Sequence, residues 1–190
     1  MQDNRFPFPD RDSSLDILLR DPCFDKIPQH RVQDIFDDAW MAGITEAKSF
    51  IDEYCHAFCF DMSSILKEFG FKMIPQDIDY VMGNVRYFCE YLSGKNTIYV
   101  YNKSVALWAE THHMEFAIAR NIILAHEFFH YLEANKIGWI SKRCTVPMLK
   151  IGKISIGKTG ISALSEVAAN SFANAYYTAY IASLGQTDDV

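Results

Sequence analysis

Two histidines and a glutamate occur together in the run His126-Glu127-Phe128-Phe129-His130, which has the pattern HExxH. On a helix, side chains four residues apart lie on one face at a spacing of about 6 Å, so both imidazoles can bind one metal ion. Glu127 follows the first histidine, where its carboxylate can accept a proton from a water molecule. Apolar residues at helical spacing surround the motif. The pattern therefore predicts a catalytic zinc site on a helix, with Glu127 as the general base.

A catalytic zinc ion needs three protein ligands and one open position, so a third ligand must come from elsewhere. No histidine follows His130, and the acidic residues that follow it are Glu133, Glu166, Asp188 and Asp189. Glu133 lies on the same predicted helix, about 10 Å along its axis from His126, and the two aspartates lie in a polar tail. This elimination favours Glu166 as the third ligand, with Cys144 as the remaining alternative donor.

The residues around Glu166 predict a second helix, from about 162 to 184. Ala169 and Ala173 fall on the same helical face as Glu166, and such small side chains allow the HExxH helix to approach closely. Asn170 lies one turn further on, where its amide can hydrogen-bond a metal ligand and orient it. The predicted site thus draws its ligands from two helices that are far apart in the sequence.

The first third of the chain reads as an arm followed by helices. Residues 1–28 contain four prolines and one short helical turn, and apolar residues then recur at helical spacing from Gln29 until Gly43 ends the run. Thr45 is placed to begin a second helix. Asp61 is placed to cap a third helix, over 63–69, with a glycine just past its end.

The middle of the chain changes from helical to strand-like spacing. Strands are predicted at 71–74, 85–92 and 97–101, the last two joined by a turn into a hairpin. The strand at 97–101 is a candidate sheet edge for an extended peptide. Residues 136–160 read as a loop with one strand at most. The layout predicts an α+β fold, mostly helical, with a small antiparallel three-stranded sheet.

Composition narrows the classes of partner. The chain has 190 residues, with 18 Lys and Arg against 24 Asp and Glu and a net charge of −6, which argues against direct binding of nucleic acid or of an anionic membrane. The first residues show no basic start followed by an apolar run, so we expect no secretion signal. The five cysteines are an odd and scattered set. We therefore expect reduced thiols and a cytoplasmic location.

A second motif points to a different chemistry. The segment 152–159 matches the phosphate-binding pattern GxxxxGK[ST]. A nucleotide-binding domain of that type also needs a parallel sheet and an acidic residue that holds magnesium. The sequence lacks the alternating strands and helices of such a sheet. We interpret the segment as a loop rich in glycine and lysine beside the predicted metal site.

The two helical motifs together resemble the ImmA/IrrE family of metallopeptidases. That family pairs an AHExGH helix with a downstream ExxANxFA helix, and the corresponding segments here are NIILAHEFFHYLE at 121–133 and SEVAANSFA at 165–173. The likeness extends over about 45–183. It implies a gluzincin-like fold, with residues 1–44 as an N-terminal arm and helix and 45–190 as the zinc metallopeptidase domain.

The resemblance also implies the roles of individual residues. It assigns His126, His130 and Glu166 as zinc ligands and Glu127 as the general base. Phe129 stands where the family has a small glycine, and after residue 173 the chain lacks the family's usual ending. The family's members act on cytoplasmic proteins, often helix-turn-helix repressors.

The sequence therefore predicts a zinc-dependent endopeptidase that cleaves a cytoplasmic protein, with a helix-turn-helix transcriptional repressor as the implied substrate. The bulk of Phe129 and the altered chain end leave one alternative open. In that alternative, the chain is a non-catalytic metal-binding protein with a regulatory or interaction role.

Overall fold

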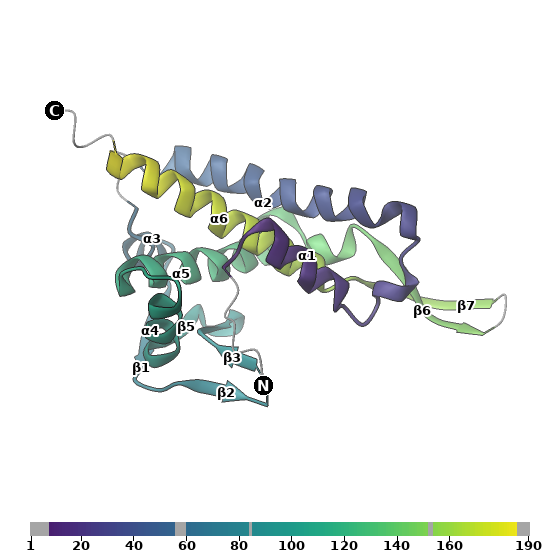
Figure 1. The fold of residues 1–190 in the computed structure, drawn as a ribbon, viewed down its shortest axis with the longest axis horizontal. Helices are drawn as coiled ribbons and strands as arrows, with labels where there is room; N and C mark the ends of the chain where they lie inside the picture. The colour runs from purple at the N-terminus through teal and green to yellow at the C-terminus, as the bar shows by residue number, and fades with distance from the viewer. Residues whose placement is uncertain (1–7, 56–59, 84, 152–153, 186–190) are drawn as a thin grey trace.

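The C-terminal helix α6 lies at the centre of the computed structural model of this chain, where it packs against α1, α2 and α5 (Figure 1). The structure describes residues 8–55, 60–83, 85–151 and 154–185. The helices are α1 (Arg11–Leu19), α2 (Val32–Tyr54), α3 (Met62–Glu68), α4 (Asn102–Thr111), α5 (Phe116–Leu132) and α6 (Ala163–Gly185). The strands are β1 (Lys72–Gln76), β2 (Tyr80–Met82), β3 (Val85–Tyr87), β4 (Cys89–Leu92), β5 (Thr97–Tyr101), β6 (Thr145–Ile151) and β7 (Ile154–Gly160).

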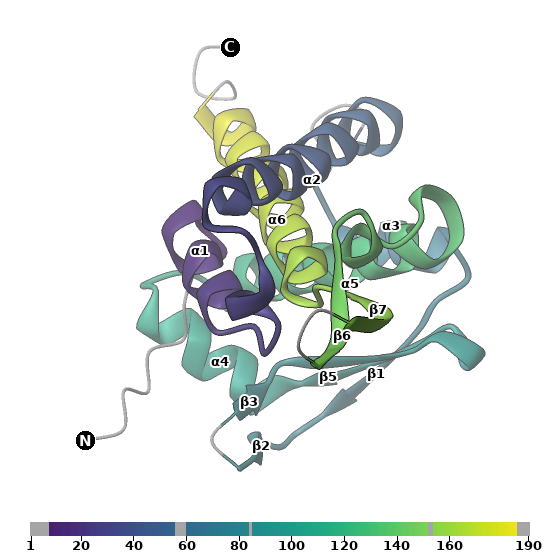
Figure 2. The same ribbon diagram turned by 90° about the vertical axis from the view of Figure 1, so that its right-hand side faces the viewer.

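The elements form layers. Helix α5 lies between the sheet that contains β5 on one side and α6 with α2 on the other (Figures 1 and 2). The predicted α+β class and the predominance of helix are confirmed. None of the helices in the described ranges is long and apolar enough to cross a bilayer.

The predicted helix that carries the HExxH pattern is present as α5, and two further predicted helices are confirmed. Helix α3 begins after Asp61, whose carboxylate accepts a hydrogen bond from the backbone N–H of Ser63, and Gly70 follows its end with a φ of +78°. Helix α6 spans almost the range predicted for the helix that carries Glu166. In both cases the signal is local: a capping side chain or a sustained apolar period.

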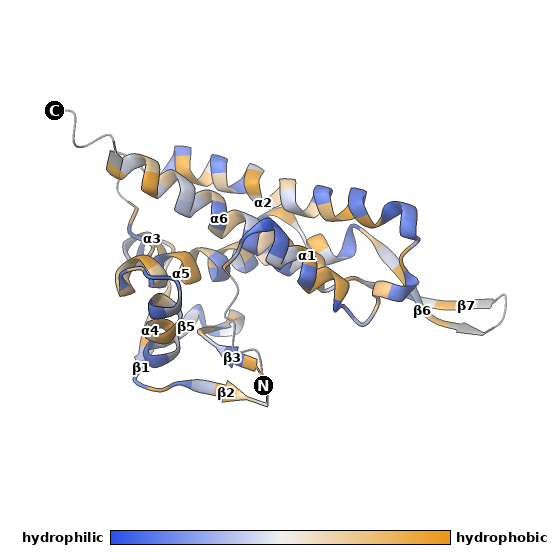
Figure 3. Cartoon of the chain, viewed as in Figure 1, coloured by the Kyte–Doolittle hydropathy of each residue, from blue (hydrophilic) through white to orange (hydrophobic). Residues whose placement is uncertain are grey.

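The prediction that Gly43 ends a helix is wrong, because α2 runs unbroken from Val32 to Tyr54. The helix is amphipathic (Figure 3), and its buried side packs along α6. A β-carbon at Gly43 would overlap the carbonyl oxygen of Ala168 and the hydroxyl of Ser171, both on α6. The glycine is therefore a point of close approach between two helices, and the predicted boundary at 44/45 falls inside α2.

The arm at the start of the chain holds more structure than the sequence indicated. Helix α1 has nine residues, capped by Asp10, and packs on α6. Helix α4 was not predicted at all. Its apolar residues are confined to the middle of the helix, where Val105 and Trp108 are buried against the core.

The predicted antiparallel sheet is wrong in one respect: the three-stranded sheet is mixed. Its strand order is β1-β5-β4, with β1 parallel and β4 antiparallel to β5. The predicted hairpin is present as β4 and β5. Strand β5 is the most apolar of the three, with four of its five residues buried, so it takes the centre of the sheet and leaves β4 at an edge.

The segment predicted as a loop with one strand at most contains an antiparallel hairpin, β6 and β7, which projects away from the helices (Figure 1). Residues 154–159 of the phosphate-binding pattern lie in β7, which pairs with β6, and residues 152–153 lie outside the described ranges. A phosphate-binding loop must follow a strand and open directly into a helix, so this placement removes the nucleotide-binding alternative.

Aromatic rings fill the space between the helices. The ring centroids of Phe50 on α2 and Phe128 on α5 lie 5.0 Å apart, and Phe172 on α6 lies 5.5 Å from Phe50. Phe128 and Phe172 are fully buried. These contacts hold α5 and α6 at a fixed spacing, which matters because each carries part of the predicted site.

The close approach at Gly43 predicts an unusual response to substitution. In an open helix, Gly43→Ala would stabilise the protein by about 1 kcal/mol. Here we expect destabilisation of roughly 1–3 kcal/mol, because the new methyl group must displace the backbone of α6. Gly94→Ala is the control, since a β-carbon at that position meets no atom within 4 Å. Urea unfolding of both variants would measure the difference, and equal stabilities would contradict the packing described.

Candidate metal centre

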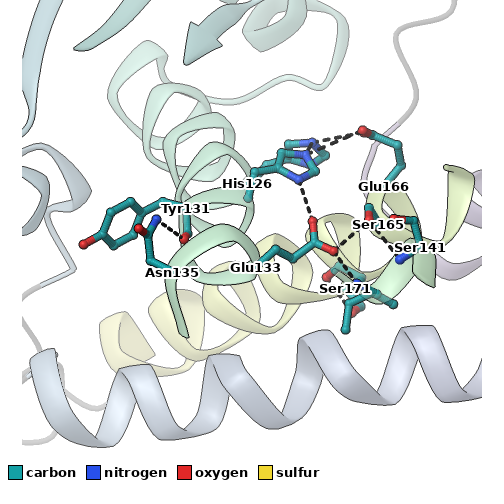
Figure 4. A network of polar contacts seen from close by, with 11 residues as sticks. His126, Tyr131, Glu133, Asn135, Ser141, Ser165, Glu166 and Ser171 are labelled. Carbon is teal, nitrogen blue, oxygen red and sulfur yellow. Dashed lines mark hydrogen bonds and ion pairs between the residues drawn. The ribbon is translucent and has the colours of Figure 1, made fainter. Parts of the chain in front are cut away.

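The structure brings together the three predicted ligands. His126 and His130 lie four residues apart on α5, and Glu166 lies near the start of α6 (Figure 4). The two Nε2 atoms are 3.3 Å apart. Glu166 presents one carboxylate oxygen to each histidine, at 3.4 Å from His126 Nε2 and 3.6 Å from His130 Nε2. All three side chains thus point at one small volume.

These spacings suit a tetrahedral metal ion. Bonds from zinc to histidine nitrogen or carboxylate oxygen are about 2.0–2.1 Å long, so two ligands of a tetrahedron lie about 3.3–3.4 Å apart. The observed separations of 3.3, 3.4 and 3.6 Å are close to that value. An ion at the centre would have three protein ligands. The half-exposed Glu166 side chain leaves the remaining side accessible to solvent.

The chemistry of the donor atoms also suits a cation. Neutral imidazole nitrogens that face one another and a carboxylate are all acceptors, so the arrangement needs a positive charge between them. Burial opposes protonation of His130, but its hydrogen bond with Glu133 and the nearby carboxylates raise its pKa to about 9. Partial burial works against ionisation of Glu166, but its contacts with His126 and His130 lower its pKa to about 2. The cluster therefore stabilises positive charge at its centre.

Glu133 was set aside above as a metal ligand, and in the structure it is instead the partner of His130. Its carboxylate is fully buried and lies 3.1 Å from His130 Nδ1. It also accepts hydrogen bonds from the backbone N–H of Ile140, at 2.8 Å, and from the hydroxyl of Ser165, at 2.7 Å (Figure 4). An Nδ1–H donated to this carboxylate leaves Nε2 of His130 as the nitrogen that can bind metal.

The local chain path explains how Glu133 acquires these partners. Helix α5 continues from Leu132 into a π-helical turn, Glu133–Ile137, and Gly138 follows with a φ of +76°. The chain then returns beside its own helix and offers the N–H of Ile140 to the buried carboxylate. A carboxylate three residues after the second histidine was the signal in the sequence. Its burial depends on the returning chain, which no local pattern predicts.

The predicted general base lies beside the cluster. Glu127 is half-buried and, together with His126, borders a cavity. Burial raises the pKa of the Glu127 carboxyl above its usual value, although the neighbouring histidines act in the opposite direction. A carboxyl with a raised pKa is better matched to proton transfer near neutral pH.

Two other predicted residues have partners that the sequence did not indicate or lie outside the cluster. Asn170 lines the same cavity as His126 and Glu127, and its buried side-chain amide donates a hydrogen bond to the hydroxyl of Ser14 on α1, at 3.1 Å. In the described part of the chain, the group of converging donors contains Glu166 and does not include Cys144. The structure therefore favours the carboxylate over the thiol as the third donor.

The bulk of Phe129 does not obstruct the site. Its ring is fully buried and lies 5.6 Å from the ring of Phe172 on α6. The side chain thus lies in the interface between α5 and α6. Phe129, which stands where the AHExGH pattern has glycine, therefore packs between the helices.

Comparisons with known proteins identify no relative of this chain. No family model, no curated protein and no solved structure matches the chain. The case for the site therefore rests on its own geometry.

Replacement of the third ligand tests that geometry directly. Glu166→Ala removes the only carboxylate within reach of both Nε2 atoms in the described ranges, so we expect zinc to be lost on dialysis. The affinity should fall by more than the roughly 10–100-fold that follows loss of an outer contact. Glu110→Ala, at an exposed position on α4, is the matched control. Metal analysis after dialysis measures the result, and an unchanged zinc content in Glu166→Ala would exclude that residue as a ligand.

Glu133 can be tested separately from the ligands. Glu133→Gln replaces one carboxylate oxygen by an amide NH2 group. That group cannot accept a hydrogen bond, so at least one of the three groups that donate to Glu133 loses its acceptor. We expect zinc affinity to fall roughly 10–100-fold, as is typical when the partner of a metal-binding histidine is lost.

Competition with a chelating dye would measure that affinity, and circular dichroism would establish that the variant folds. Glu110→Gln is the control because it makes the same substitution at an exposed position on α4. A folded Glu133→Gln protein with the zinc affinity of the wild type would show that His130 needs no such support.

Proposed function

We propose that this chain is a zinc-dependent endopeptidase of the ImmA/IrrE type. The observation that supports this most strongly is the spacing of the donor atoms of His126, His130 and Glu166, which suits one tetrahedral ion, with the Glu127 carboxylate next to it. A zinc ion held there would lower the pKa of a water molecule to near 7 and polarise a peptide carbonyl.

The residues of the chain supply the proton transfers and the positioning. Glu127 accepts the proton of the attacking water and then delivers it to the leaving nitrogen of the cleaved peptide bond. Glu133 keeps His130 in the orientation that the site requires. The half-exposed position of Glu166 leaves room for a substrate carbonyl to approach.

An edge strand beside the site suits an extended peptide. The sequence suggested 97–101 as that edge, but β5 is the central strand, and β4 is an edge strand within the described residues. Strand β4 also packs against α5, the helix that carries the histidines. An extended substrate can add to β4 by backbone hydrogen bonds, which is a common mode of peptide recognition.

The resemblance extends the proposal to the kind of protein cleaved. We take the substrate to be a cytoplasmic protein, with a helix-turn-helix transcriptional repressor as the specific candidate. The negative net charge fits a role that involves no direct contact with nucleic acid. The alternative of a non-catalytic metal-binding protein was favoured by the bulk of Phe129, and that bulk lies buried between α5 and α6.

Glu127→Gln separates the peptidase from the metal-binding alternative. The amide cannot accept the proton, so we expect zinc content to stay at the wild-type level while cleavage falls by at least about 100-fold. Unfolded casein and a purified helix-turn-helix repressor would serve as substrates, with fragments identified by mass spectrometry. The wild-type activity should disappear with a chelator and return with zinc. Wild-type turnover by Glu127→Gln would disprove the role of the base, and capture of the repressor without fragments would favour the binding protein.

A further inference from the structure

A cavity of about 230 Å³ opens beside the HExxH helix. His126 and Glu127 border it, so any group inside it lies next to the position of a scissile peptide bond. Its walls come from several elements: Ile122 and Ile123 of α5, and Trp108 of α4. The cavity is thus placed where a substrate side chain adjacent to the cleaved bond would enter.

The walls of the cavity are mainly apolar. Ile122, Ile123 and Trp108 are all buried. The one cationic side chain outside the metal cluster is Arg86, and both of its bonds to Asp79 are short, at 2.6 and 2.9 Å. Because that charge is already paired, it does not call for an acidic ligand. An acidic group in the cavity would lose its hydration without gaining an unpaired arginine or lysine, which is costly.

The N-terminal arm closes one side of the cavity. Pro9 and Ile17 line it, from the start of the described chain and from α1. The ring of Phe8 stacks on Trp108 with centroids 5.9 Å apart. The Ser14 hydroxyl accepts the hydrogen bond from Asn170 of α6. These contacts hold the arm against α4 and α6, and the arm therefore forms a fixed wall of the cavity.

We infer that this cavity is the pocket for a bulky apolar side chain of the substrate, such as phenylalanine or leucine, next to the cleaved bond. This inference rests on the proposed function, because the chain has a peptide substrate only if it is a peptidase. The size agrees, because a cavity of about 150 Å³ already holds benzene. The N-terminal arm thereby takes part in specificity, although it lies outside the segment that resembles metallopeptidases.

Peptide cleavage gives the first test. Quenched fluorescent peptides in an alanine and serine background carry one Phe, Leu or Asp, and mass spectrometry identifies the bond that is cut. We expect cleavage next to Phe or Leu with kcat/KM at least about tenfold above that of the Asp peptide. Equal rates for all three peptides, or cuts with no preference, would overturn the pocket and leave the peptidase in place.

Variants of the arm locate the preference in this cavity. Ile17→Phe fills the space and should reduce cleavage of the Phe peptide about tenfold relative to the Ala background peptide. Ile17→Ala enlarges the space and should shift the preference towards Trp. Leu19→Phe makes the same kind of change at a 46% exposed position on α1 outside the cavity, and should change neither preference. If all three variants showed the same preference, this cavity would not be the site that selects the substrate side chain.

A binding measurement keeps the inference independent of catalysis. N-acetylphenylalanine amide is titrated into the metal-free wild-type protein and followed by the NMR signals of the isoleucine methyl groups, with N-acetylaspartate amide as the comparison. We expect saturable shifts with the phenylalanine compound alone, weakened by Ile17→Phe. Binding without any peptide cleavage would support the apolar pocket and remove the proposed function. Absence of binding together with absence of preference would overturn the pocket.

Discussion

The buried carboxylate of Glu133 is the contact on which the geometry of the site depends. A fully buried carboxylate is costly unless hydrogen bonds satisfy it, and its three donors come from three separate parts of the chain. His130 belongs to α5, Ile140 to the returning segment, and Ser165 to the start of α6. Because Ser165 precedes Glu166 directly, the same carboxylate that orients His130 also fixes the helix end that carries Glu166, the proposed third ligand.

Close helix packing makes that arrangement possible. Ala168 and Ala169 of α6 are fully buried, and Gly43 of α2 lies against the same helix. Small residues at these crossings bring the three helices close enough for the donor atoms on α5 and α6 to converge on one small volume. Phe129 fits into the same interface by packing on Phe172. The apolar core thus sets the distance between the helices, and the polar network then sets their register.

The sequence predicted those features that depend on local spacing. The HExxH pattern, the cap at Asp61 and the apolar period of α6 each involve residues within one or two turns of one another, and the structure contains the helices they predicted. Glu166 was found because elimination left few donors.

The features that the sequence did not predict depend on contacts between distant segments. A glycine that ends a helix and a glycine that lets two helices touch look alike in a sequence, and only the position of α6 distinguishes them at Gly43. The order of the strands in the sheet and the burial of Glu133 are non-local in the same sense. Helical spacing alone predicted that Asn170 hydrogen-bonds a metal ligand. Its hydrogen-bond partner in the structure is Ser14 of α1, which that spacing could not indicate.

The N-terminal arm is joined to the metal site by more than the cavity wall. The Asp21 carboxylate accepts hydrogen bonds from the Ser162 hydroxyl, at 3.0 Å, and from the backbone N–H of Ala163, at 2.9 Å. It therefore caps the N-terminus of α6, one turn before Glu166, where a negative charge is favourable to the helix. The helix that carries Glu166 is thus held at its start by Glu133 through Ser165 and by Asp21 of the arm. The arm therefore both fixes the start of the helix that carries Glu166 and walls the adjacent cavity, which joins the candidate metal centre to the proposed substrate pocket.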